Sequence, residues 1–106
     1  MKGYEERRRG FEAEFARNQE LVFRAIVRGN KLFGLWAAER LGLPTGEAEA
    51  YAKSVVNADF DAPGDNDVIA KVRADLVAKG ILLDEAELRT ELARAVTEAR
   101  RQLAEA

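Results

Sequence analysis

Apolar residues recur at intervals of three and four positions in four segments of this chain of 106 residues. This interval is the repeat of an α-helix, whereas a half-buried strand places an apolar residue at every second position. The sequence has no segment that alternates cleanly in that way, and its β-branched residues are sparse. The pattern therefore predicts an all-α protein, and the length suits one domain with a single core.

Turn and cap signals divide the chain into four expected helices. The first runs in one helical phase from about residue 4 to residue 41 and ends at a glycine. The second begins after a Pro-Thr-Gly turn and ends in an acidic turn at residues 59–67. Because the connections are short, neighbouring helices should be antiparallel, and the predicted architecture is a small antiparallel four-helix bundle. The predicted cap and end positions are Gly42, Asp65, Gly80 and Asp84.

The first helix is predicted to have two unequal halves. At about 100° per residue, which is the helical advance, Tyr4, Phe11 and Phe15 fall on one line. The same line continues through Val22 to Phe33, so both belong to the same helical phase. Only the second half carries further apolar residues beside this line, and only that half is wide enough to pack a core. The first half carries a single file of aromatic side chains.

Two glycines lie in the middle of this helix. Gly29 and Gly34 should each weaken it by on the order of 1 kcal/mol relative to alanine. Gly34 also lies close to Ala37 and Ala38, and small residues of this kind would allow a neighbouring helix to approach closely. Trp36, the single tryptophan, lies between Gly34 and Ala37, and we expect it to be a packing centre.

The composition excludes several kinds of chemistry. The sequence has no cysteine and no histidine. This removes thiol nucleophiles, disulfides, the common zinc ligands and the side chain best suited to proton transfer near neutral pH. Paired carboxylates such as Glu47 and Glu49 lie where a helix begins, and the helix dipole favours anions there. We therefore expect a protein that is not an enzyme, with no catalytic residues.

The acidic turn at residues 59–67 shares some features with a calcium-binding loop. Its fifth position is Pro63, however, and Ala70 stands where such a loop requires a glutamate that binds through both oxygens. The turn is therefore interpreted as a polar connection between helices, and no metal site is predicted.

Charge and hydropathy also limit the partners. The net charge is −2, whereas a dedicated nucleic-acid binder usually shows a clear basic excess. The sequence contains no apolar run near the roughly 20 residues that span a bilayer. We expect a cytoplasmic protein that binds no nucleic acid and does not insert into the membrane.

The first 20 residues carry five basic and five acidic side chains. An arginine run at residues 7–9 is flanked by glutamates at helical spacing, which favours a solvated helix face over a nucleic-acid site. Two interpretations weigh equally on the pattern alone. The segment is either a frayed extension of the first helix, or it becomes ordered on a partner and buries its apolar anchors in a groove.

Three blocks of the chain, together with FEAEFA at residues 11–16, are similar to a known family. The blocks are NKLFGLWAAERLGL (30–43), EAEAYAKSVVNADF (47–60) and GDNDVIAKVRADL (64–76). In order and spacing they resemble the ATPase-inhibitor zeta subunit of alphaproteobacterial F-type ATP synthases. The resemblance covers essentially the whole chain.

The resemblance implies a four-helix bundle at residues 18–106 and a mobile N-terminal arm at residues 1–17, disordered or frayed when free. In that family the arm becomes helical as it inserts between catalytic subunits of the ATP synthase head and contacts the central stalk. It blocks ATP hydrolysis much more than ATP synthesis, because it stops rotation in the hydrolytic direction. The resemblance implies no required cofactor and a protein that is a monomer when free. When bound to the synthase, the protein would be associated peripherally with the inner membrane.

Carried over by position, the resemblance assigns the contacts of the arm. Gly10 departs from the family pattern, in which a better helix former is usual, and this implies a weaker arm. The family's bundle has also been associated with adenine nucleotides, so one alternative is a small helical module that binds ATP or ADP weakly. Another alternative is a structural adaptor without inhibitory activity. The implied apolar anchors are Tyr4, Phe11 and Phe15, and the implied charged contacts are Glu5, Arg7, Arg8, Arg9, Glu12, Glu14 and Arg17.

Overall fold

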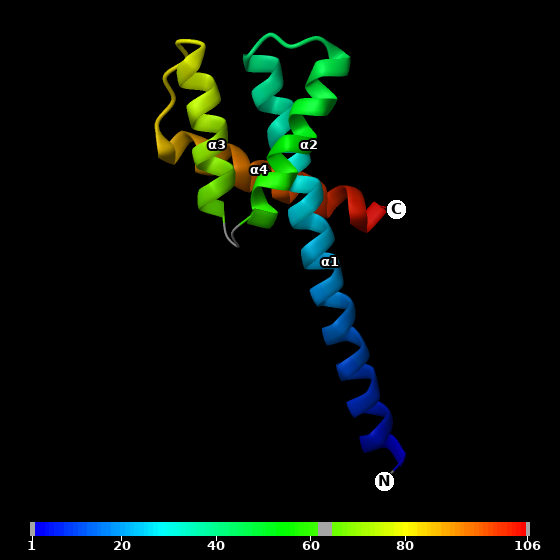
Figure 1. The fold of residues 1–106 in the computed structure, drawn as a ribbon. Helices are drawn as coiled ribbons and strands as arrows, with labels where there is room; N and C mark the ends of the chain where they lie inside the picture. Colours follow the sequence, from blue (N-terminus) through cyan, green and yellow to red (C-terminus); the bar gives the residue numbers. More distant parts are fainter. Residues whose placement is uncertain (1, 62–64, 106) are drawn as a thin grey trace.

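The structure is a computed structural model that describes the chain path of residues 2–61 and 65–105, and the side chains of residues 19–59 and 66–105. Within these residues the chain forms four α-helices and no strand, which confirms the all-α prediction (Figure 1). The helices are α1 (Lys2–Arg40), α2 (Thr45–Asp61), α3 (Asp65–Ala78) and α4 (Glu85–Glu105).

The helix ends follow from local sequence chemistry. Gly42 and Gly80 adopt left-handed φ angles of 73° and 77°, which glycine reaches without steric cost. After each of them a backbone N–H turns back to the helix: Leu43 N donates to the Ala38 carbonyl at 3.0 Å. At the start of α4 the backbone N–H of Glu87 donates to an Asp84 carboxylate oxygen at 2.8 Å. These three predicted ends are confirmed, whereas the side chain of Asp65 lies outside the described residues.

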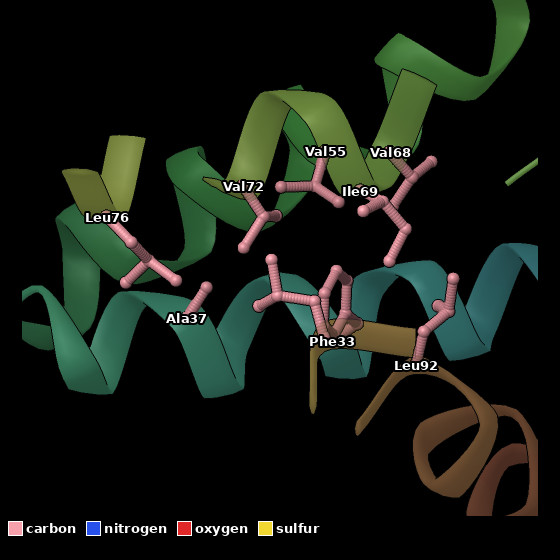
Figure 2. Close-up of a cluster of buried hydrophobic side chains, with 9 residues drawn as sticks. Phe33, Ala37, Val55, Val68, Ile69, Val72, Leu76 and Leu92 are labelled. Atoms are coloured by element: carbon pink, nitrogen blue, oxygen red, sulfur yellow. The ribbon is translucent and has the colours of Figure 1, made fainter. Parts of the chain in front are cut away.

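The first three helices alternate in direction, as the short connections predict, and α4 lies across them (Figure 1). Side chains from all four helices converge around Phe33, which is fully buried (Figure 2). Nonlocal packing of this kind supplies most of the stability of short helices in water. The core cluster consists of Phe33, Ala37, Val55, Val68, Ile69, Val72, Leu76, Leu88 and Leu92.

The two glycines in the middle of α1 mark the places where other helices cross it. A methyl group added at Gly29 would lie 2.6 Å from Val96 Cγ2 and 2.9 Å from Val96 Cα, on α4. A methyl group at Gly34 would lie 2.8 Å from Ala52 Cα, on α2. The predicted close approach at Gly34 is therefore confirmed. For Gly29 the sequence predicted only a local weakening of the helix and missed its role in packing.

Trp36 packs at the edge of the core rather than at its centre, which corrects the sequence-based expectation. Its ring stacks on Phe33 with centroids 5.6 Å apart and an angle of 9° between the planes. On the outer side the Arg40 guanidinium lies 5.2 Å from the Trp36 ring centroid, within the range of a cation–π contact. Phe33 takes the central position because it is the ring that all four helices enclose.

Hydrogen bonds between polar side chains join the helices outside the apolar core. Asn30 is 2% exposed, and its amide donates to an Asp59 carboxylate oxygen at 3.0 Å, which links α1 to α2. The Tyr51 hydroxyl donates to Asp75 at 2.8 Å, which links α2 to α3. Burial, and then this hydrogen bond, hold the pKa of Tyr51 well above its usual value, so the hydroxyl stays a donor.

Candidate partner-binding helix and adjacent basic groove

Helix α1 is much longer than the bundle that it joins. Its 39 residues span about 58 Å at 1.5 Å per residue. The whole molecule measures 65 Å along its longest axis but only 24 and 22 Å across it, so α1 sets the length. Figure 1 shows the N-terminal half of α1 extending away from the other three helices. We call residues 2–24 the projecting segment.

The predicted contact residues all lie on the projecting segment. They fall between Tyr4 and Arg17, and the chain there is part of the same unbroken helix as the bundled half of α1. Their side chains lie outside the described ones, so their contacts and the predicted division after residue 17 stay predictions. The structure adds that α1 is continuous across that predicted division.

The bundle starts to cover α1 at Ala25, which is 1% exposed. Just before it, Leu21, Val22 and Phe23 are 36%, 45% and 58% exposed. The prediction that Val22 is a core position is therefore wrong, because the neighbouring helices do not reach it.

A groove of about 640 Å³ lies beside the base of the projecting segment. Helix α1 lines it together with residues of α2 and the last turns of α4. Its apolar lining residues are Phe23, Val27, Val56 and Leu103, and its polar lining residues are Arg24, Arg28, Lys31, Lys53 and Asn57. We call it the basic groove, because four cationic side chains and no acidic one line it.

Two of these cations form ion pairs with acidic side chains that do not line the groove. Arg24 pairs with Glu20 at 2.6 Å, and both side chains are well exposed. Lys31 lies 3.7 Å from a Glu49 oxygen, a longer and exposed ion pair. Exposed pairs like these contribute little to stability and exchange readily with another anion.

The lining of the groove is complementary in charge to an anion. Its lining offers cationic donors and apolar surface, with no carboxylate and no nucleophile beside a base. Among the described residues there is no cluster of three or more acidic side chains placed to hold a metal ion. The spacing of Arg24, Arg28 and Lys31 places them on one face of α1, a signal in the sequence that was not used to predict a site. Lys53 belongs to α2, and only the packing of α2 against α1 brings it beside them.

No helix in the described part of the chain has an apolar stretch of the length that a bilayer crossing requires. The two longest helices, α1 and α4, are both rich in charged residues.

Comparison with known proteins agrees with this architecture. A solution NMR structure is 46% identical in sequence, with a TM-score of 0.69, and the match covers 78% of this chain and 94% of that chain. The search of curated proteins gave no significant match. The family described as ATPase inhibitor subunit zeta matches residues 1–102, which is nearly the whole chain. The chain therefore belongs to the ATPase inhibitor subunit zeta family.

Proposed function

We propose that this protein inhibits ATP hydrolysis by an F-type ATP synthase by inserting its projecting segment at a catalytic interface. The observation that carries the proposal is that the N-terminal half of α1 projects beyond the bundle (Figure 1). Membership of the inhibitor family supplies the target. The action is steric, and no covalent step is involved.

The bundle makes insertion of the helix less costly. An isolated segment that becomes helical must first form a turn, and this nucleation step is unfavourable in water. The bundled half of α1 is already helical and packed, so the projecting segment only extends an existing helix. The partner then supplies the apolar contacts, each worth about 1.5–3 kcal/mol when a large side chain is fully buried.

The proposed anchors are Tyr4, Phe11 and Phe15, which share one face of the helix. The charged residues between them would pair with groups of the synthase head and central stalk. A helix seated this way blocks rotation in the direction of hydrolysis, while the bundle stays outside the interface. The inhibitor thus associates with the membrane through the synthase and not through a helix of its own.

The experiment adds the protein to its cognate ATP synthase and follows ATP hydrolysis. A variant lacking residues 2–17 should lose inhibition while far-UV circular dichroism and Trp36 fluorescence show that the bundle remains folded. Trp36 is a suitable reporter because it packs on Phe33, far along α1 from the deletion. Full inhibition by the truncated protein would place the active segment elsewhere and refute the proposal.

The basic groove favours a second candidate function, the weak binding of adenine nucleotides. Phosphates would lie on the cationic residues, such as Arg28 and Lys53, and the exposed ring of Phe23 could stack on the base. Titration with ATP should then shift amide signals around the groove, and Arg28→Gln should reduce the effect. The matched control is Arg100→Gln, since Arg100 is exposed on α4 and does not line the groove. Shifts that persist unchanged in Arg28→Gln would argue against this site.

A further inference from the structure

The exposed apolar residues of this protein are concentrated at the base of the projecting segment. Five large apolar side chains are exposed among the described residues, and three of them are consecutive: Leu21, Val22 and Phe23. Single exposed apolar residues are normal on a protein surface, but a contiguous group marks a contact surface. The other two, Val77 and Leu82, lie near the end of α3 and in the turn that follows it, far from the projecting segment (Figure 1).

Two of the three residues face the same side as the core. At about 100° per residue, Val22 and Phe23 lie within about 60° of the mean direction in which Phe33 and Ala37 enter the core. Leu21 points about 140° away from that direction. The core-facing stripe of α1 therefore continues for one turn on the N-terminal side of Ala25, where Val22 and Phe23 are 45% and 58% exposed.

The stripe also continues the line of the arm. Val22 lies seven residues, or about two turns and 10 Å, after Phe15 on one unbroken helix. Val22 is within about 20° of the line through Tyr4, Phe11 and Phe15. A groove that receives those anchors therefore meets Val22 next, on the same face. Glu20 and Arg24 pair at 2.6 Å on the opposite face, where they leave this line apolar.

From this continuity we infer that the contact surface for the ATP synthase extends through Phe23, and that Val22 and Phe23 are apolar contacts at the mouth of the receiving groove. The inference rests on the proposed function and adds to it a second set of anchors beyond residue 17. The partner that contacts Val22 and Phe23 is the ATP synthase that receives the arm, because these residues and the anchors of the arm lie on one continuous helix. The bundle then stops insertion where Ala25 becomes covered.

The test compares matched substitutions in the full-length protein. Val22→Gln and Phe23→Gln should each raise the concentration needed for half-maximal inhibition of ATP hydrolysis by at least about fivefold, since each removes one buried apolar contact. Val77→Gln is the matched control, because Val77 is the same residue type on a helix and is 49% exposed, against 45% for Val22. Val77→Gln should inhibit as the parent protein does.

The possible outcomes separate this inference from the proposed function. Unchanged inhibition by both variants, with inhibition lost on deletion of residues 2–17, would overturn the inference and leave the proposed function standing. Inhibition retained after that deletion would refute the proposed function itself. A dimer of the free protein that Val22→Gln dissociates would assign this face to a second copy and also overturn the inference. Circular dichroism confirms the fold of each variant, and Val22→Ala, a better helix former, replaces Val22→Gln if that variant misfolds.

Discussion

The two halves of α1 belong to one helix but have different surroundings. From Ala25 to Ala38 the helix is enclosed by α2, α3 and α4, and its contact face is built from small residues around one large ring. From residue 19 to residue 24 every side chain is exposed, although large apolar residues are present there. The local sequence thus makes both halves of α1 helical. Whether an apolar side chain of α1 belongs to the core or remains available for contact with another protein depends on whether α2, α3 and α4 cover it.

The largest difference in the free energy of unfolding should come from replacing a phenylalanine by alanine in each half of α1. Phe33→Ala should lower the free energy of unfolding by about 3–5 kcal/mol, because Phe33 is fully buried where all four helices meet. Phe23→Ala should change it by less than about 0.5 kcal/mol, because Phe23 is 58% exposed. Urea denaturation followed by circular dichroism measures both values. Similar losses for the two variants would show that the bundle covers Phe23 in solution.

Sequence reasoning succeeded where the signal lies within a few residues. Gly42, Gly80 and Asp84 end or begin helices through contacts with neighbours three to five positions away, and these were predicted. Periodicity also predicts that Phe33 is a core residue. It could not predict that Val22 is exposed, because Val22 has the same helical phase and differs only in where the other helices end.

The candidate site divides in the same way. The arm is identified by its aromatic line and by the family resemblance, both of which are properties of one segment. The basic groove depends on Lys53 of α2 and Leu103 of α4 lying beside α1, which no local pattern specifies. The course of α4 across the bundle was missed for the same reason: its crossing point depends on Gly29 meeting Val96, a contact between distant parts of the chain.

A glycine in the bundled half gives the second prediction. Gly34→Ala should lower the free energy of unfolding by about 1–3 kcal/mol, because the added methyl group would lie 2.8 Å from Ala52 Cα. This loss should appear although alanine is the better helix former by about 1 kcal/mol. Gly46→Ala is the control, since a methyl group there has no atom within 4 Å. An increase in the stability of Gly34→Ala would show that α1 and α2 can move apart at little cost.

The smallest expected effect comes from the glycine of the projecting segment. Gly10→Ala should leave the free energy of unfolding of the bundle unchanged, because residue 10 precedes the first bundle-covered position by fifteen residues. It should lower the cost of keeping the arm helical by about 1 kcal/mol. If the arm binds as a helix, this difference makes inhibition up to about fivefold tighter. Weaker inhibition by Gly10→Ala would instead indicate that the partner approaches the backbone closely at this glycine, in the way that α2 approaches Gly34.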